Sequence, residues 1–136
     1  MINILNPSQE EKDELLRRWR HIYNDNTFRI FTWDTHGEMA WIAEYATRCT
    51  NYLEIGCYAG RSAKIALLAN PTLKMTILDT WDDEGVFEDC QHNLRKEIAE
   101  GRVTLIRGLS QETISQVKDQ QFDGCWIDGG HLTHLV

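Results

Sequence analysis

Proline, long apolar runs and basic residues are all scarce in this sequence of 136 residues. The two prolines are Pro7 and Pro71, and with no low-complexity tract between them no segment is typical of a linker. No stretch approaches the roughly 18 apolar residues of a membrane-spanning helix, and the N-terminus has no apolar signal core. The sequence therefore predicts a single domain over residues 1–136 that is not bound to a membrane, and the cytoplasm is its expected location.

Positive charge and paired cysteines are scarce as well. The formal net charge is -7, which provides no basic field for a phosphate backbone and disfavours nucleic acid as a partner. Four cysteines are far apart and form no C-x-x-C pair of the kind that holds zinc. We expect reduced, buried thiols at most of these positions, which are Cys49, Cys57, Cys90 and Cys125.

Two helices are expected in residues 1–50. Ser8 and Glu11 have the spacing of a capping box, and apolar residues at helical intervals extend the first helix to about Asn24. A second helix is expected to begin near Asp34 or Thr35 and to bury one apolar face. The pattern between them, Thr27–Trp33, predicts no particular structure.

From residue 51 onward, short apolar segments alternate with helical ones. Strands are predicted over Tyr52–Ile55, Lys74–Asp79, Val103–Arg107 and Phe122–Asp128. Helices are predicted over Ser62–Ala69, Val86–Glu100 and Gln111–Lys118. This alternation is typical of an α/β fold with a parallel sheet, right-handed crossovers and helices on both faces. The last strand is apolar enough to be covered on both faces.

A glycine turn follows the first of these strands, in the stretch NYLEIGCYAGRS. Ligands of parallel α/β sheets bind beyond the carboxyl ends of the strands, and glycines there let backbone N–H groups approach a ligand. A dinucleotide fingerprint requires small residues where this chain has Tyr58 and Arg61, so that interpretation fails. What remains is the pattern E-x-G-x-x-x-G, formed by Glu54, Gly56 and Gly60.

An acidic residue, Asp79, ends the second predicted strand 23 residues after Gly56. Its carboxylate offers two acceptor oxygens to the hydroxyls of a ribose. An ordinary tight turn between a strand and a helix is the alternative explanation of the glycines. The glycine turn and the strand-end acid together favour a nucleotide-like ligand.

Five segments resemble the class I S-adenosylmethionine-dependent methyltransferases, in particular a small-molecule branch with the motifs E-I-G-x-x-x-G-R-S and I-D-G-D-H. The segments are LEIGCYAGRSAKIALLA, ILDTW, FEDCQHNL, GLS and FDGCWIDGGH, within residues 38 to 134. The resemblance implies a Rossmann-like sheet of strand order 3-2-1-4, with residues 51–136 as the cofactor-binding half. S-adenosylmethionine is the implied cofactor.

The resemblance also implies a set of cofactor contacts. The glycines would pass under the methionine part, Glu54 would organise its ammonium group, Ser62 would cap the following helix, and Asp79 would hold the ribose. Trp81 would either cover the adenine ring or pack on a helix. Leu109 stands where the family commonly has an aspartate. Because a leucine side chain cannot accept a hydrogen bond, Ser110 or the backbone would have to bind the adenine. The implied residues are Glu54, Gly56, Tyr58, Gly60, Arg61, Ser62, Asp79, Thr80, Trp81, Ser110 and Asp128.

Two residues after the fourth strand are candidates for chemistry. In metal-dependent relatives an aspartate at the position of Asp128 binds a divalent cation such as Mg²⁺; the alternatives are a methionine-site acid or a cap of the next turn. His131 would be the general base that takes a proton from an acceptor hydroxyl, or else a surface histidine.

The resemblance predicts O-methylation of a small molecule. Because Val136 follows Asp128 by only eight residues, the sequence lacks the last three strands of the family sheet. We therefore expect either that another subunit supplies the missing part or that the chain is a truncated, weakly active remnant. The bare edge of its fourth strand should lead to self-association, or to poor solubility where no partner binds. The alternative is a non-catalytic module that binds S-adenosylmethionine or an adenosine nucleotide.

Overall fold

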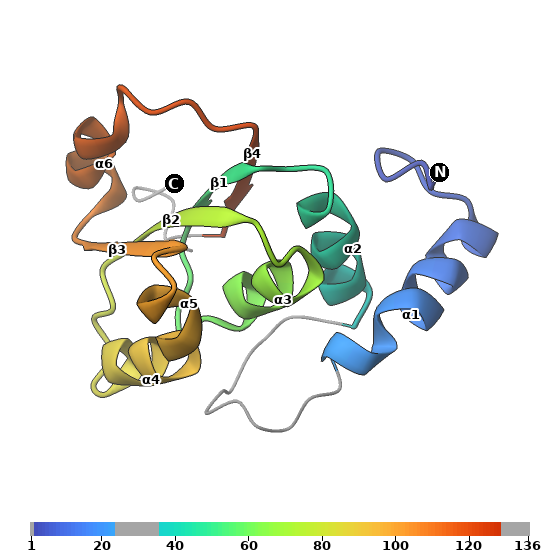
Figure 1. Cartoon of the computed structure of the whole chain (residues 1–136), viewed down its shortest axis with the longest axis horizontal. Coiled ribbons are helices and arrows are strands. Elements are labelled where there is room, and N and C mark those ends of the chain that lie inside the picture. Colours follow the sequence, from blue (N-terminus) through green and yellow to red (C-terminus); the bar gives the residue numbers. More distant parts are fainter. Residues whose placement is uncertain (1, 24–35, 129–136) are drawn as a thin grey trace.

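The computed structural model describes residues 2–23 and 36–128. The segment Thr27–Trp33 and the expected start of the second helix at Asp34 or Thr35 lie outside the described residues. Figure 1 shows a sheet with helices on both sides and α1 beside α2 at its periphery.

Helix α1, Gln9–Tyr23, begins where the capping box predicts. The Ser8 backbone N–H donates to Glu11 Oε1 at 3.1 Å, and the Glu11 N–H donates to Ser8 Oγ at 3.2 Å. Two backbone donors that an α-helix leaves without intrahelical partners are thereby satisfied. Hydrogen bonds to the Glu11 carboxylate from the Asn3 N–H and then from the Ser8 N–H lower the pKa of Glu11.

Helix α2, His36–Ala46, buries the face that the sequence predicts. Met39, Ile42, Ala43 and Ala46 are all buried, as is Cys49 just beyond the helix. The Arg18 guanidinium of α1 binds the buried Glu44 carboxylate of α2, which joins the two helices.

Four parallel strands form the sheet in the order β3-β2-β1-β4. Strands β2, Lys74–Asp79, and β3, Val103–Arg107, have the predicted bounds, and β1 is Asn51–Ile55. Strand β4, Gly124–Ile127, is shorter than the predicted Phe122–Asp128, and the Asp123 side chain before it binds the start of β1. Its carboxylate accepts hydrogen bonds from the backbone N–H groups of Thr50 and Asn51 at the start of β1.

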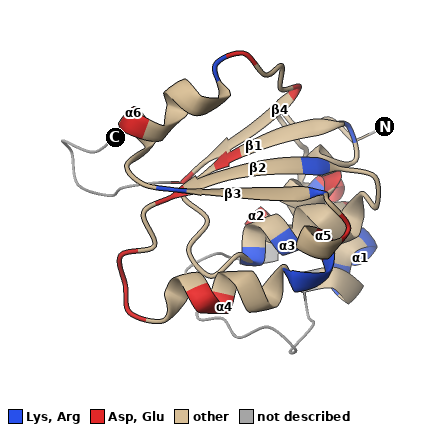
Figure 2. Ribbon diagram, turned by 60° about the vertical axis from the view of Figure 1, so that its left-hand side comes forward, with Lys and Arg blue, Asp and Glu red and all other residues tan. Residues whose placement is uncertain are grey.

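Helix α3, Arg61–Ala69, follows β1. The helix predicted over Val86–Glu100 is divided into two helices. Helix α4, Val86–Asn93, and helix α5, Arg95–Ala99, meet at Leu94, whose φ of -103° and ψ of 11° are not helical. Likewise α6, Ser110–Thr113, continues as the 3₁₀ turn η1, Ile114–Val117. Figures 1 and 2 both show α2 to α5 on one side of the sheet and α6 on the other.

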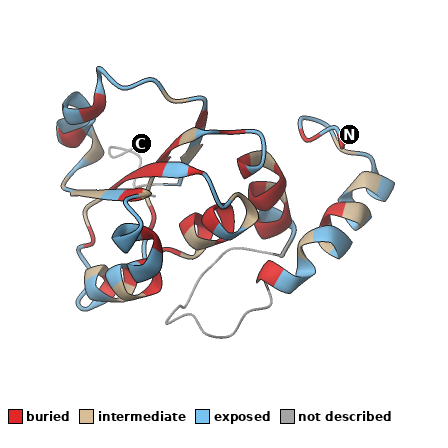
Figure 3. Cartoon of the chain, in the orientation of Figure 1, coloured by how far each residue is buried: buried red, intermediate tan, exposed pale blue. Residues whose placement is uncertain are grey.

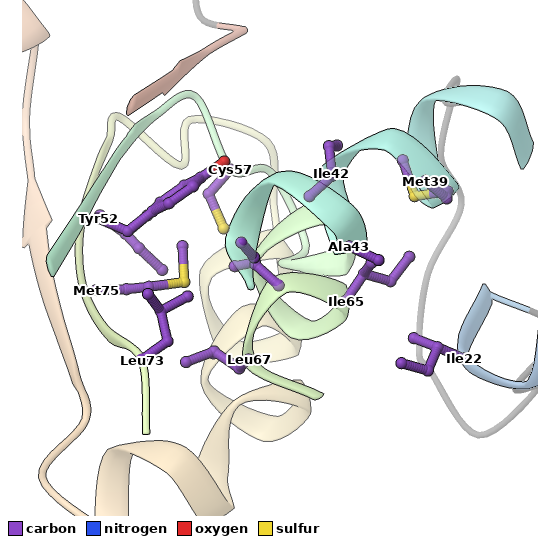
Figure 4. Packing of buried hydrophobic residues seen from close by; sticks show 14 of the residues in the cluster. Ile22, Met39, Ile42, Ala43, Tyr52, Cys57, Ile65, Leu67, Leu73 and Met75 are labelled. Carbon is purple, nitrogen blue, oxygen red and sulfur yellow. The ribbon is translucent and has the colours of Figure 1, made fainter. Parts of the chain in front are cut away.

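The main core lies between the sheet and helices α2 and α3. Figure 3 shows that buried positions concentrate on these helices and on the strands. Figure 4 shows Ile42 and Ala43 of α2 gathered with Ile65 of α3 in this core, and Tyr52 of β1 with Met75 of β2. No helix among the described residues is long and apolar enough to cross a membrane.

Strand β4 is not covered on both faces, which corrects the expectation from its apolar sequence. Cys125 is exposed and Ile127 is 69% exposed, whereas Gly124 and Trp126 lie against the α2 side. A side chain on Gly124 would collide with Cys49 Sγ at 2.4 Å, so the backbone of β4 approaches the end of α2 closely. The other three cysteines are buried free thiols, as predicted.

Candidate functional site

The ends of β1, β2 and β3 converge through backbone hydrogen bonds. Gly56 N–H donates to the Leu78 carbonyl, and Gly108 N–H donates to the Asp79 carbonyl, both at 2.9 Å. Gly56 and Gly60 have φ values of 86° and 95°, a left-handed region that favours glycine. The five-residue segment from Gly56 to Gly60, here called the glycine turn, leads directly into α3 at Arg61.

The Asp79 carboxylate binds the backbone of the glycine turn. Its Oδ2 atom accepts the N–H groups of Cys57 at 2.7 Å and Tyr58 at 2.8 Å. Its Oδ1 atom accepts the N–H of Trp81 at 2.8 Å. A carboxylate has about four acceptor positions, so these three bonds leave about one for a ligand. Asp79 thus joins the loops that follow β1 and β2.

The carbonyl groups of the glycine turn are bound as well. The Cys57 carbonyl accepts the Gly60 N–H at 3.0 Å, which closes the turn. The Tyr58 carbonyl accepts Trp81 Nε1 at 2.8 Å, and the Ala59 carbonyl accepts Asn93 Nδ2 at 2.9 Å. Side chains from two neighbouring segments therefore fix the direction of successive peptide groups.

Trp81 is a packed residue of this assembly. It is 1% exposed, and its ring lies 4.8 Å from the Phe87 ring. The Arg107 guanidinium lies 4.9 Å from the same Phe87 ring and donates to the Thr80 and Trp81 carbonyls. Of the two roles considered for Trp81, packing is what the structure shows, and contact with an adenine stays a prediction.

Glu54 and Ser62 lie together beneath the start of α3. Glu54 is 1% exposed, and the Ser62 hydroxyl donates to its Oε1 atom. The prediction that Ser62 caps the helix is wrong, because Gly60 occupies the N-cap position and makes no side-chain cap bond. Ser62 instead holds a buried carboxylate near the positive end of the helix dipole.

The end of β3 forms a second glycine turn. Gly108 has a φ of 146°, and a Cβ there would lie 2.8 Å from Thr113 Cγ2, so the loop packs closely on α6. Ser110 is the first residue of α6, and Leu109 precedes it with a partly exposed side chain. Both residues lie at the carboxyl ends of the strands, as does the glycine turn after β1.

Asp128 lies at the carboxyl ends of the strands too, since its N–H donates to the Ile55 carbonyl at 2.8 Å. Its side chain is exposed. His131 lies outside the described residues, so its role as a base stays a prediction. Within residues 2–23 and 36–128, no three His, Cys, Asp or Glu side chains are grouped to hold a metal ion. Mg²⁺ binding at Asp128 therefore stays a prediction, since that ion is commonly held by one or two carboxylates together with water and substrate oxygens.

Tyr58 combines a strained backbone with an exposed ring. Its φ is 52°, which is uncommon for a residue with a bulky side chain, and the residue is 46% exposed. Desolvation, together with the charge of Asp83, raises the pKa of its hydroxyl. Figure 2 shows the acidic segment between β2 and α4 to which Asp83 belongs.

Two residues of the site were not predicted from the sequence. Asn93 lies within the motif FEDCQHNL, but the pattern predicts only that it lies inside the helix Val86–Glu100. Arg107 ends a predicted strand and lies opposite Asp79 in the sheet. Because neighbouring parallel strands end on the same side of a sheet, its position at the strand end could have placed it in the site.

Comparison with known sequences identifies the family. The sequence pattern of the family described as "Methyltransferase domain" matches residues 53–136, more than half of the chain. The chain belongs to this methyltransferase family. Among curated proteins, no sequence matches it significantly.

Solved structures share the fold of this methyltransferase chain. The methyltransferase PaMTH1 from Podospora anserina, bound to SAH (S-adenosylhomocysteine), has a TM-score of 0.62 at 21% identity. The match covers 85% of this chain and 50% of the PaMTH1 chain. An O-methyltransferase from Bacillus cereus in complex with SAH has a TM-score of 0.59 at 18% identity, covering 92% and 56%. A third, TomG from Streptomyces achromogenes in complex with SAM, has a TM-score of 0.61 at 16% identity, covering 85% and 53%.

At these identities the likeness establishes the fold, a Rossmann-like methyltransferase sheet of order 3-2-1-4. The chain spans about half the length of the structures that it matches.

Proposed function

We propose that this chain binds S-adenosylmethionine and S-adenosylhomocysteine at the glycine turn, as the cofactor half of a small-molecule O-methyltransferase. The observation that carries the proposal is the Asp79 carboxylate, which ends β2 and holds the turn after β1 through two backbone N–H groups. The family membership and the cofactors named for the structural neighbours support the same ligand.

The residues around the turn have the chemistry that this cofactor requires. Asp79 keeps about one acceptor position for a ribose hydroxyl, and it is partly exposed. Helix α3 begins beside the turn, so its positive end favours the methionine carboxylate. The buried Glu54 carboxylate lies under that helix and supplies negative charge near a cationic ammonium group.

Methyl transfer to oxygen is the reaction we propose, with a small molecule as the acceptor. When bound, S-adenosylmethionine supplies a methyl group on a positively charged sulfur. The chain's contribution would be to hold the donor in a fixed orientation, which reduces the entropy cost of the reaction. Asp128 follows the last residue of β4 at the same end of the sheet, and His131 is proposed to accept the proton from the acceptor hydroxyl.

Two further expectations remain proposals. The outer edge of β4 is proposed to pair with a second copy of the chain, because β4 is the terminal strand of the sheet among the described residues and an edge strand presents backbone N–H and C=O groups to a partner. Sedimentation velocity at micromolar concentration tests this, and a monomer at all concentrations would contradict it. A location in the cytoplasm is proposed from the reduced thiols.

Calorimetric titration of the chain with S-adenosylmethionine, S-adenosylhomocysteine and NAD tests the cofactor assignment. The proposal requires saturable binding of the first two at one site per chain and no binding of NAD. Saturable binding of NAD or of adenosine alone would favour the nucleotide-binding module instead. A methyl-transfer assay with catechol-like and other hydroxylated acceptors then separates a catalytic chain from a non-catalytic one.

A further inference from the structure

Asn93, the last residue of α4, contacts the glycine turn from the helix side. It is 4% exposed, and its Nδ2 atom donates to the Ala59 carbonyl at 2.9 Å. A buried amide is costly unless it is hydrogen bonded, so this contact fixes the position of the turn relative to α4.

Helix α4 approaches the turn closely at this point. A Cβ on Gly60 would lie 3.3 Å from Cys90 Sγ and 3.4 Å from Leu94 Cγ. The Cys57 and Cys90 sulfur atoms are 3.7 Å apart on the same side. The Asn93 hydrogen bond is therefore made across a buried, closely packed contact, where its geometry has little freedom.

The direction of the Ala59 carbonyl determines the direction of the next N–H group. In a trans peptide the C=O and N–H groups point in opposite directions, so an Ala59 oxygen bound to α4 turns the Gly60 N–H the other way. That N–H donates to the Cys57 carbonyl at 3.0 Å and closes the turn. Helix α3 starts at the next residue, Arg61, so the orientation of its first N–H groups depends on this peptide.

We infer that Asn93 is a positioning residue, which holds the peptide between Ala59 and Gly60 in the orientation that the methionine part of S-adenosylmethionine requires. The inference rests on the proposed function, since it concerns the same ligand. Asn93 does not touch the cofactor in this account, and its effect on binding passes through the backbone of the turn.

The test uses Asn93→Leu, which has a similar volume and no donor, and Arg102→Met as the matched control. Arg102 donates to the Leu67 and Asn70 carbonyls at the far end of α3, so its loss also weakens a polar contact of that helix. Thermal unfolding and the Kd for S-adenosylhomocysteine are measured for both variants and for the original chain. We expect both to unfold at lower temperature, with Kd raised about ten-fold only in Asn93→Leu.

A second variant, Asn93→Asp, gives a readout that a purely structural role would not produce. An ionised carboxylate repels the Ala59 carbonyl, whereas a protonated one donates to it again, and burial raises the pKa of such a group. The ratio of its Kd to that of the original chain should therefore fall from about ten at pH 8 to about two at pH 5. This variant, measured at both pH 8 and pH 5, also decides the matter if Asn93→Leu does not fold.

The outcomes distinguish the two proposals. Binding by the original chain with unchanged Kd in both folded Asn93 variants would overturn the positioning role and leave the cofactor assignment intact. A Kd ratio for Asn93→Asp that does not change with pH would also overturn it. An original chain that binds neither S-adenosylmethionine nor S-adenosylhomocysteine would overturn the proposed function and this inference with it.

Discussion

The Asp79 carboxylate lies 2.7 Å from the backbone nitrogen of Cys57, so a side chain at the end of β2 holds the turn that follows β1. The two residues are 22 positions apart in the sequence and are brought together by the parallel pairing of the strands. This contact holds the glycine turn in one shape, and a preorganised site lowers the entropy cost of binding.

Replacing Asp79 should weaken both the turn and the ligand site. In Asp79→Asn one acceptor oxygen becomes an N–H donor that faces the backbone N–H groups of Cys57 and Tyr58 or of Trp81. Hydrogen bonds to charged groups contribute about 1.5 to 3 kcal/mol each, so we expect at least a ten-fold higher Kd for S-adenosylhomocysteine. Calorimetry measures it, with the exposed neighbour Asp82→Asn as control. Equal affinities in the two variants would remove Asp79 from the site.

The positive φ of Tyr58 makes a prediction about stability. Tyr58→Gly and Tyr58→Ala remove the same exposed ring, but alanine keeps a strain of roughly 1 to 2 kcal/mol that glycine avoids. Glycine loses about 0.4 to 1 kcal/mol through its freer unfolded chain, so Tyr58→Gly should be the more stable variant by about 0.5 to 1 kcal/mol. Urea unfolding measures the difference.

The control for this pair is Leu68, a partly exposed residue within α3. At that position the order should reverse, with alanine more stable than glycine by about 1 kcal/mol, because its backbone is helical. If alanine is more stable than glycine at position 58 as well, the backbone of Tyr58 is not strained.

Arg102 should stabilise the fold without affecting the site. Its guanidinium donates to the Leu67, Asn70 and Leu73 carbonyls, at the end of α3 and in the turn that follows. Arg102→Met retains much of the apolar contact but loses these bonds, and a loss of about 2 kcal/mol in unfolding free energy is expected. Chemical denaturation measures it. A change of less than about 0.5 kcal/mol would mean that water replaces the guanidinium at no cost.

Asp123 predicts how stability depends on pH. Desolvation opposes its ionisation, but hydrogen bonds from the Asn51 and Thr50 N–H groups and the Thr50 hydroxyl outweigh this and lower its pKa. A carboxyl group with a lowered folded-state pKa stabilises the protein above its unfolded-state pKa. That stabilisation is lost as the pH falls through the folded-state pKa.

The difference in Tm between the original chain and Asp123→Asn should therefore shrink as the pH falls from about 7 to about 3. Differential scanning calorimetry across this range measures it. A difference that stays constant would mean that the charge of Asp123 has no part in joining β1 to the segment before β4.

Sequence patterns located the strands well, and they failed where three-dimensional contacts decide. Strands β2 and β3 have the predicted bounds because their apolar runs end at polar residues. The break at Leu94 was missed, since the helical pattern continues through it and only packing against Gly60 reveals the change.

Within the site, residue types were easier to predict than their partners. Asp79 was expected to bind a ligand, and the structure shows that it also binds three backbone N–H groups, which no linear pattern specifies. Ser62 was predicted as a cap because it stands near the start of a helix, whereas Gly60 occupies the N-cap position and the Ser62 hydroxyl donates to the buried Glu54. The role of Asn93 depends on where α4 ends relative to the turn, which is a tertiary property.

Nuclear magnetic resonance of the ¹⁵N-labelled chain, titrated with S-adenosylhomocysteine, tests the location of the cofactor most directly. Binding at the glycine turn predicts that the largest amide shifts fall on residues 56 to 62 and 79 to 81, with little change in α1 or at Thr50 beside Asp123. Saturable shifts centred on any other part of the chain, or no shifts at millimolar ligand, would contradict the account.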